Sequence, residues 1–239
     1  MEHDPFILFQ KICITEPDKL RTLYSYAEMI YNENRKFNLT GNKSLIEIID
    51  NLIVGSLEPL TCMNVPRGTF FADLGTGAGI PGIPVAVKYP EISGILFDSN
   101  QKKIDFIDRV AGILKIKNIK AINIRIEDAG RSPEFREKFD LIITRAMSDI
   151  YTISELGAPL LKKGGYIYAY TKINREEITD YVYNHISRLG LAVRKDSDVK
   201  LLREGTCAEG ILIEKVNSTD EKFPRRMAVI KRMAGKNEM

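Results

Sequence analysis

A stretch of fourteen residues constrains the fold of this chain more than any other. Phe71–Pro84 reads FADLGTGAGIPGIP, so an apolar run is followed by four glycines and two prolines. Glycine tolerates positive φ angles and lets another molecule approach the backbone N–H groups closely. The stretch therefore predicts a buried strand, a tight loop and the start of a helix, which is where open parallel sheets bind their ligands.

From residue 69 onward, short apolar runs alternate with runs of helical periodicity, as in a parallel sheet covered by helices on both faces. The expected strands are Thr69–Leu74, Gly94–Phe97, Lys120–Arg125, Leu141–Thr144, Tyr166–Thr171, Leu191–Lys195 and Gly210–Val216. The expected helices are Ile83–Lys88, Gln101–Leu114, Ile150–Leu161 and Arg175–Leu189. No helix fits between the last two strands, so we expect them to pair in antiparallel. The prediction is an α/β, Rossmann-like fold with a seven-stranded, mostly parallel sheet and an antiparallel edge strand.

Helical patterns precede the sheet. One helix is expected after Thr15, which resembles an N-cap, and a second over Ser44 to about Leu60. We therefore expect residues 1–64 to form an N-terminal helical cap, 65–217 the sheet domain, and 218–239 a basic C-terminal tail of the same unit.

Composition excludes several classes of protein. The 239-residue chain has a net charge of only +3, and its three cysteines lie far apart without C-x-x-C spacing. We expect no disulfide framework and no metal. No apolar run approaches the roughly 20 residues that cross a bilayer, and the start, MEHDP, is acidic where a signal peptide is basic. We expect a cytoplasmic monomer with no membrane contact.

The spacing of acidic residues and glycines narrows the ligand. A dinucleotide-binding G-x-G-x-x-G would need glycine where Ile80 stands, and no Gly-Lys-Ser/Thr follows as in a P-loop. The order Asp73-x-Gly75-x-Gly77-x-Gly79 instead resembles motif I of class I S-adenosylmethionine (AdoMet) methyltransferases. Asp98 resembles their motif II acid, which accepts the ribose hydroxyls. Two simpler explanations stay open: the glycines could serve only a tight turn, and Asp98 could cap the next helix.

Several longer stretches resemble one family. They are DLGTGAGIPGIPVAVKYPEI at 73–92, LFDSNQKKIDFI at 96–107, RIED at 125–128, FDLIITRA at 139–146, FNLTG at 37–41, PLLKKGGYIYAYTK at 159–172 and KFPRR at 222–226. They closely resemble the RsmG family, also called GidB, over nearly the whole chain. The resemblance implies the class I methyltransferase fold, AdoMet as cofactor, and 16S rRNA of the small ribosomal subunit as substrate. The methyl group would go to N7 of one guanine in the 530 loop.

The resemblance also implies which residues act. Cofactor-binding positions would be Asp73, Gly75, Thr76, Gly77, Gly79, Ile80, Asp98, Ser99, Ile126, Glu127 and Arg145. RNA-binding positions would be Arg125, Arg145, Lys172, Lys222, Arg225 and Arg226. Glu127 could instead belong to a solvated turn. The tail could be a solvated basic terminus, and part of it could form a short amphipathic helix.

The chemistry at N7 needs alignment but no general base, because N7 has an in-plane lone pair and no proton. We therefore expect Arg145 and Lys172, rather than either histidine, to be the catalytic residues. The alternative for Arg145 is a salt bridge to Asp73 or Asp149.

Two other functions stay open. One is an AdoMet methyltransferase of another substrate, a divergent paralogue, although no N/D-P-P-Y/F motif follows the fourth strand. The other is a non-catalytic ribosome-binding protein with a residual AdoMet pocket, against which the intact acids and glycines weigh. Glu47 stands where relatives commonly carry histidine, which leaves the RNA contacts of the cap open.

Overall fold

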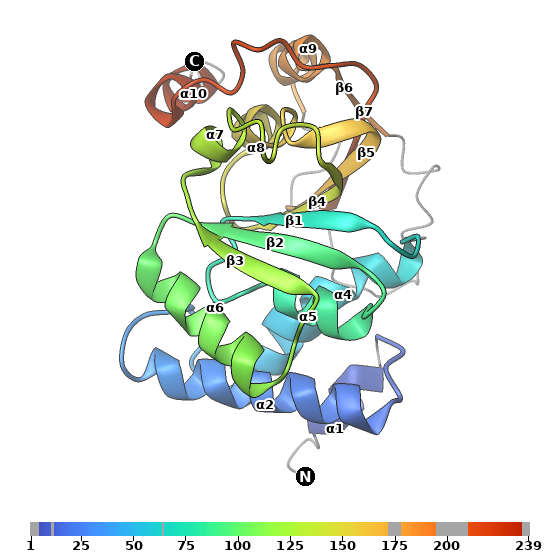
Figure 1. Cartoon of the computed structure of the whole chain (residues 1–239), viewed down its shortest axis with the longest axis vertical. Coiled ribbons are helices and arrows are strands. Elements are labelled where there is room, and N and C mark those ends of the chain that lie inside the picture. Colours follow the sequence, from blue (N-terminus) through green and yellow to red (C-terminus); the bar gives the residue numbers. More distant parts are fainter. Residues whose placement is uncertain (1–4, 11, 64, 172–177, 195–209, 236–239) are drawn as a thin grey trace.

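One sheet of seven strands runs through the described part of the chain, which the computed structural model gives as residues 5–10, 12–63, 65–171, 178–194 and 210–235 (Figure 1). The strands are β1 (Phe70–Leu74), β2 (Ser93–Asp98), β3 (Ile119–Asn123), β4 (Phe139–Arg145), β5 (Leu161–Tyr170), β6 (Leu191–Val193) and β7 (Gly210–Lys215). Their order is β3-β2-β1-β4-β5-β7-β6. The predicted α/β fold with a mostly parallel sheet is confirmed.

The position of the antiparallel strand differs from the prediction. β7 runs antiparallel to both β5 and β6. Because it lies between them, the antiparallel strand is not the outermost one, and β6 forms the edge. The expected antiparallel pairing of the last two strands is present.

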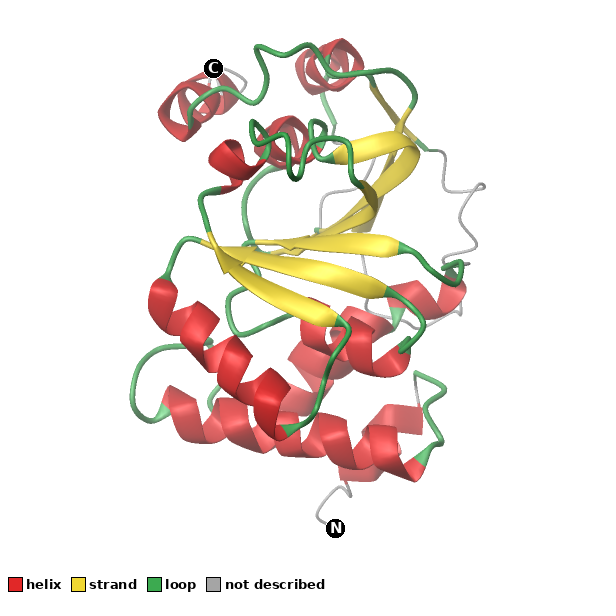
Figure 2. Cartoon of the chain, viewed as in Figure 1, coloured by secondary structure: helices red, strands yellow, loops and turns green. Residues whose placement is uncertain are grey.

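Helices cover both faces of the sheet, as Figure 2 shows. One face carries α1 (Pro5–Gln10), α2 (Pro17–Asn34), α3 (Leu45–Glu47), the π-helical η1 (Ile48–Val54), α4 (Gly55–Leu57), the 3₁₀ turn η2 (Pro59–Cys62), α5 (Gly82–Lys88) and α6 (Gln101–Ile113). The other carries α7 (Ile126–Ala129), α8 (Ile150–Gly157), α9 (Asp180–Arg188) and α10 (Met227–Ala234). None of these helices combines the length and the apolarity that a membrane span requires.

The N-terminal helices share a core with the sheet. Along β1, Phe71 faces the core that contains Ile30 of α2 and Ile53 of η1, whereas Ala72 and Leu74 face the opposite core. This alternation is the two-residue period of a strand that is buried on both faces. The helices at 5–62 therefore pack directly on the sheet, while the division at residues 64 and 217 stays a prediction.

Several boundaries differ from the sequence prediction, among them the end of α8, which stops at Gly157 rather than at Leu161. Glu16, not Thr15, occupies the N-cap of α2, and its side chain makes no capping bond. The stretch after Ser44 is a succession of short helical segments instead of one α-helix, although Ser44 and Glu47 do form a capping box. β5 begins at Leu161 rather than Tyr166, because Leu161 pairs with Phe139 across an irregularity in the ladder.

Candidate active site

Three glycines with left-handed backbone form the loop after β1. Gly75, Gly77 and Gly79 have φ angles of +69°, +61° and +96°, which residues with a side chain rarely adopt. The backbone N–H of Thr76 donates to the carbonyl of Phe97 near the end of β2 (3.0 Å) and ties the loop to that strand. The predicted succession of strand, tight loop and helix start is confirmed, since β1 ends at Leu74 and α5 begins at Gly82.

Asp73 is fully buried beneath this loop. Its Oδ2 accepts hydrogen bonds from Oγ1 of Thr76 (2.7 Å) and from the backbone N–H of Gly82 (2.8 Å). Its Oδ1 has no hydrogen-bond partner among the described residues. Burial raises the pKa of Asp73 to about 7 against the effect of the two hydrogen bonds, and the charge of Asp98 adds to the rise. A buried acceptor without a donor fits a ligand that brings a cationic donor.

Gly82, at the start of α5, packs against the same carboxylate. A Cβ atom at Gly82 would lie 2.8 Å from Oδ2 of Asp73 and 2.7 Å from Cγ of Leu96. No larger residue fits there without displacing the strand or the acid. Glycine at this position therefore brings the first turn of α5 against Asp73.

Asp98 closes the loop from the neighbouring strand. Its Oδ2 accepts from the backbone N–H of Gly77 (3.0 Å), and its Oδ1 accepts from the backbone N–H of Asn100 (2.9 Å). The N-cap of α6 is Asn100, whose side chain accepts from the N–H of Lys102 (3.0 Å). Asp98 is thus not the helix cap that the simpler explanation assumed. It stands at the carboxyl end of β2, directly against the glycine loop.

Arg145 ends β4 and is held by the N-terminal helices. Its Nη1 donates to the carbonyl of Leu52 (3.2 Å) and to Oγ of Ser56 (3.0 Å). Its guanidinium lies 5.9 Å from the ring centre of Tyr170. Burial lowers the pKa of Arg145. The alternative salt bridge is absent among the described residues, and Asp149 instead caps α8 by accepting from the N–H of Thr152 (2.8 Å).

The other predicted cofactor residues lie at the same edge of the sheet. Ile126 and Glu127 begin α7, directly after β3, and both are buried, so Glu127 is not part of a solvated turn. Ile80 is buried in the glycine loop, and Ser99 is exposed after β2. Lys172 lies outside the described residues. Carboxyl ends of parallel strands thus bring Asp73, Asp98, Glu127 and Arg145 to one edge, as the strand order requires.

The basic residues near the tail divide into two groups. Arg125, Lys222 and Arg226 are exposed, and Lys222 pairs with Asp220 (2.8 Å). Arg225 instead donates through Nε (2.8 Å) and Nη2 to the fully buried Glu155. Because its guanidinium is paired with Glu155, Arg225 is not among the residues that we propose to bind RNA. The suggested amphipathic helix in the tail is present as α10.

Several residues of the site were not identified from the sequence. The hydroxyl of Tyr26 donates to the carbonyl of Ala78 in the glycine loop (2.8 Å). Cγ of Met147 lies 3.1 Å from the place of a Cβ on Gly75, so this side chain covers the loop. A fully buried tyrosine on an apolar helix face is a usable signal for Tyr26, because a buried hydroxyl needs a partner. Nothing in the local sequence indicates Ser56.

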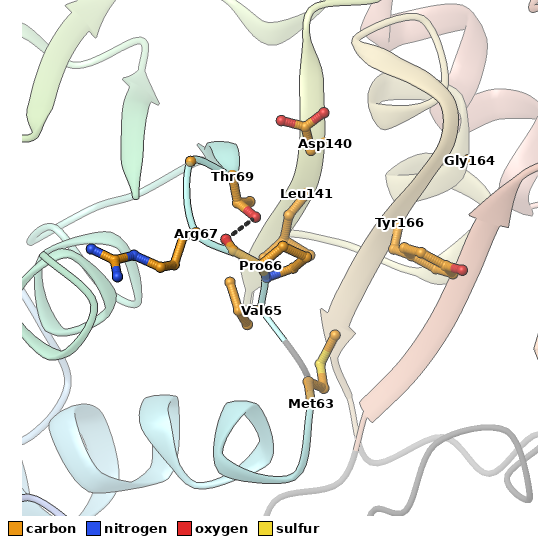
Figure 3. Close-up of a pocket in the computed structure, with 10 residues that line it drawn as sticks. Met63, Val65, Pro66, Arg67, Thr69, Asp140, Leu141, Gly164 and Tyr166 are labelled. Atoms are coloured by element: carbon orange, nitrogen blue, oxygen red, sulfur yellow. Dashed lines mark hydrogen bonds between the residues drawn. The ribbon is translucent and has the colours of Figure 1, made fainter. Parts of the chain in front are cut away.

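A separate cavity lies at the opposite edge of the sheet, at the amino ends of β1 and β4 (Figure 3). It measures about 390 Å³ and is lined by Met63, Val65, Pro66, Arg67, Gly68, Thr69, Asp140, Leu141, Gly164 and Tyr166. Asp140 already accepts from the backbone N–H of Phe70 and from Lys162 (both 2.8 Å), and the guanidinium of Arg67 points away from the other lining side chains. Parallel sheets bind ligands at their carboxyl ends, so this cavity is not part of the candidate active site.

The strand order and the acidic, glycine-rich edge define a class of protein, the class I AdoMet-dependent methyltransferases. A solved S-adenosylmethionine-dependent methyltransferase from Aquifex aeolicus shares the fold with a TM-score of 0.50 and 16% identity, covering 68% of this chain and 92% of that one. The chain belongs to the rRNA small subunit methyltransferase G family (GidB), whose family model matches residues 19–189.

Two relatives named ribosomal RNA small subunit methyltransferase G support this membership. The protein of Desulfitobacterium hafniense (strain Y51) is 36% identical over 87% of this chain and 86% of its own length. That of Clostridium botulinum (strain Loch Maree / Type A3) is 33% identical over 90% of each chain. The predicted family, the methyltransferase class and the cofactor AdoMet are confirmed.

Proposed function

We propose that this protein transfers the methyl group of AdoMet to N7 of one guanine in the 530 loop of 16S rRNA, in the small ribosomal subunit. The unpaired, buried Oδ1 of Asp73 beside three glycines of positive φ carries the cofactor part of this proposal. Family membership supports the substrate part, because the family is described as an rRNA small subunit methyltransferase.

The residues around the loop fit AdoMet group by group. Oδ1 of Asp73 would accept a hydrogen bond from the ammonium of the methionine part, and Thr76 holds that carboxylate in place. Asp98 would accept the ribose hydroxyls, chiefly through Oδ1, which has a lone pair left beyond its backbone contact, whereas Oδ2 also faces Nζ of Lys103 at 3.6 Å. Ile126 and Glu127 would contact the adenine, with Ser99 and Ile80 at the sides.

When bound, AdoMet supplies an electrophilic methyl group on a sulfonium. The N7 lone pair forms the new N–C bond as the S–C bond breaks, the positive charge passes to the guanine, and no proton leaves. The chain therefore has to position the base rather than deprotonate it. Arg145, with its guanidinium aligned by Leu52 and Ser56, would donate to guanine O6 or to a phosphate. We assign Lys172 a similar role from the family resemblance.

Exposed cations outside the cofactor loop would hold the RNA backbone. Arg125 stands directly before α7, and Arg226 and Lys222 flank the anchored part of the tail. Their contribution should depend steeply on salt. The proposal includes a cytoplasmic, monomeric enzyme, which size-exclusion chromatography with light scattering tests.

The deciding experiment is methyl transfer from labelled AdoMet to small ribosomal subunits that lack the endogenous modification, followed by mapping of the labelled nucleotide. We expect label on N7 of a single 530-loop guanine. Gly77→Asp should abolish transfer, because its side chain would enter the open space over the loop, where the cofactor has to approach the backbone, and would bring a second negative charge next to Asp98. Arg145→Ala should lower kcat sharply, and Arg145→Lys should rescue little because one ammonium cannot reproduce the guanidinium geometry.

The matched control is Arg67→Ala, which changes an exposed arginine at the opposite edge of the sheet and should leave transfer unchanged. Label on another nucleotide, or tight AdoMet binding without transfer to rRNA, would overturn the substrate assignment and leave the cofactor site standing.

A further inference from the structure

A second hollow lies where α2 ends and the following loop begins. It measures about 790 Å³ and is lined by Tyr31, Asn34, Arg35, Asn38, Leu39, Thr40, Gly41 and Lys43. Its lining has two cations, two amides, a hydroxyl and an aromatic ring, but no carboxylate. Such a lining suits an anionic ligand with flat, polar groups. We call it the α2-end hollow.

The wall of the α2-end hollow is pre-formed. Oδ1 of Asn34 accepts from the backbone N–H groups of Leu39 (2.9 Å) and Thr40 (2.8 Å). Its Nδ2 donates to the carbonyls of Thr40 (3.1 Å) and Asn42 (2.7 Å). One amide thus fixes four backbone groups of the loop 39–42. Little conformational entropy has to be lost when a ligand binds such a wall.

The cations of the hollow are available. Among the described residues, neither Nζ of Lys43 nor the guanidinium of Arg35 takes part in a hydrogen bond or ion pair. By contrast, Lys36 on the same turn pairs with Glu33 (3.3 Å), which also pairs with Arg109 of α6 (2.8 Å). The carboxylate of Glu47 accepts the backbone N–H of Lys43 (2.8 Å). Backbone N–H groups are the main cause of the lowered pKa of Glu47 and the charge of Lys43 adds to it, but neither Lys43 nor Arg35 is held in a direct ion pair.

A short chain of contacts connects this hollow to Arg145. Asn42, next to Lys43, accepts through Oδ1 from Nδ2 of Asn51 (3.0 Å). The residue after Asn51 is Leu52, whose carbonyl holds Arg145. In Figure 1 the loop after α2 also lies on the side toward which β2 and β3 point. The hollow and the candidate active site therefore lie on the same side of the sheet and are linked through the residues that hold Arg145.

We infer that the α2-end hollow is a second RNA-binding site, which takes single-stranded nucleotides that flank the methylated guanine. This inference rests on the proposed function and adds a site to it. Arg35 and Lys43 bind phosphates, the ring of Tyr31, which is 37% exposed, stacks on a base, and the Asn38 amide meets a base edge. The aromatic ring and the amides favour RNA over a free phosphate, which needs only the cations.

The test measures RNA binding directly. A labelled RNA hairpin that carries the 530 loop is titrated with wild type, Arg35→Gln/Lys43→Gln, Tyr31→Leu and Tyr31→Phe at several salt concentrations. We expect the double variant to bind about tenfold or more weakly at 0.1 M salt, and its log–log salt slope to fall by about 1.4, since each phosphate contact contributes about 0.7. Tyr31→Leu should weaken binding about fivefold or more, and Tyr31→Phe should not, because the stacking ring remains.

Lys36→Gln is the matched control, because its charge is already paired on the same turn, and it should shift the slope little. AdoMet affinity and thermal midpoint should be equal in all variants, and the single variants Arg35→Gln and Lys43→Gln, each with a slope change of about 0.7, replace the double variant if that protein does not fold. In methyl transfer, the double variant should raise KM for the subunit and leave kcat nearly constant. A wild-type slope and affinity in the double variant would overturn the inference. Displacement of the RNA from wild type by inorganic phosphate, with no effect of Tyr31→Leu, would mean a simple anion site and would also overturn it.

The two proposals fail in different ways. If wild type methylates the guanine and the variants match it in RNA binding, only the second site is wrong. If wild type transfers no methyl group to rRNA, the proposed function is wrong, and the hairpin titration still decides whether the hollow binds RNA.

Discussion

Two carboxylates of this protein are equally buried but lie in opposite electrostatic situations. Asp73 and Glu155 are both 0% exposed, on opposite faces of the sheet. For Asp73, burial raises the pKa to about 7. For Glu155, burial also acts to raise the pKa, but the hydrogen bonds from Arg225, with the nearby ring of His185, outweigh it and lower the pKa to about 2. The comparison teaches that the partner, not the depth, decides the charge of a buried acid.

The difference separates a structural acid from a functional one. Glu155 receives the guanidinium of Arg225, its backbone N–H (2.8 Å) and, at 3.3 Å, Nε2 of His185. Those contacts fasten the chain before α10 to α8. Asp73 receives only neutral donors, and one of its oxygens has no partner among the described residues. The Asp73 carboxylate can therefore pair with the cationic group of a ligand, because no described residue supplies such a group.

The largest effect should come from breaking the structural pair. Glu155→Gln leaves Arg225 without its counter-charge, and we expect the free energy of unfolding to fall by about 3–5 kcal/mol. Urea denaturation measures this. AdoMet affinity, measured by calorimetry at a temperature where the variant is folded, should be unchanged. A large loss of AdoMet affinity with little loss of stability would contradict the assignment of Glu155 to structure.

Asp73→Asn should show the reverse pattern. Removing the charged acceptor should weaken AdoMet binding about 100-fold, the value of a charge-assisted hydrogen bond in a buried site. Stability without ligand should stay constant or rise at pH 8, because the variant no longer carries a carboxylate that is costly to ionise. Calorimetry and urea denaturation of the same preparation check both. Equal AdoMet affinity in wild type and variant would remove Asp73 from the site.

A smaller effect is expected in the pH dependence of AdoMet affinity, which should reflect the raised pKa of Asp73. With a pKa of about 7, Asp73 is protonated below that pH and must lose its proton to meet an ammonium. AdoMet affinity should therefore fall as pH drops through 7, by at most tenfold per unit, with a proton released on binding near pH 6.5. Calorimetry in buffers of different ionisation enthalpy detects the proton, and Asp73→Asn should show none.

In the absence of ligand, the contributions of the two acids to the free energy of unfolding change with pH in opposite directions. Since the folded pKa of Asp73 is raised, its contribution is present at about pH 4 and is lost as pH rises through about 7. Since that of Glu155 is lowered, its contribution is present above its ordinary value of 4.5 and is lost as pH falls toward about 2. Unfolding curves of the two variants against pH separate these contributions.

The smallest effect should come from an exposed pair. Lys222 and Asp220 lie 2.8 Å apart, but both side chains are more than half exposed. We expect Lys222→Ala to leave the urea midpoint nearly unchanged, because water and salt screen such pairs. The urea series that includes Glu155→Gln provides the scale. A loss as large as that of Glu155→Gln would contradict the view that burial sets the value of these pairs.

Sequence patterns predicted what local spacing encodes. The strand before Gly75, the left-handed glycines and the placement of Asp98 and Glu127 after neighbouring strands follow from periodicity and from the geometry of parallel sheets. The partners of Arg145 and Arg225 did not follow, because they lie 89 and 70 residues away in the sequence. Spacing carries no information about such contacts. The predicted end of the helix that begins at Ile150 was wrong, because the buried residues Leu160 and Leu161 fit a helix and a strand equally well.

The hold of the N-terminal helices on Arg145 has a consequence for how such enzymes can be rebuilt. The arginine belongs to the sheet, but Leu52 and Ser56 determine where its guanidinium points. In a chimera that joins this sheet to the helices of another methyltransferase, different helix residues would orient the guanidinium of Arg145. Substrate selection and the alignment of Arg145 would then change together, because both depend on the same N-terminal helices.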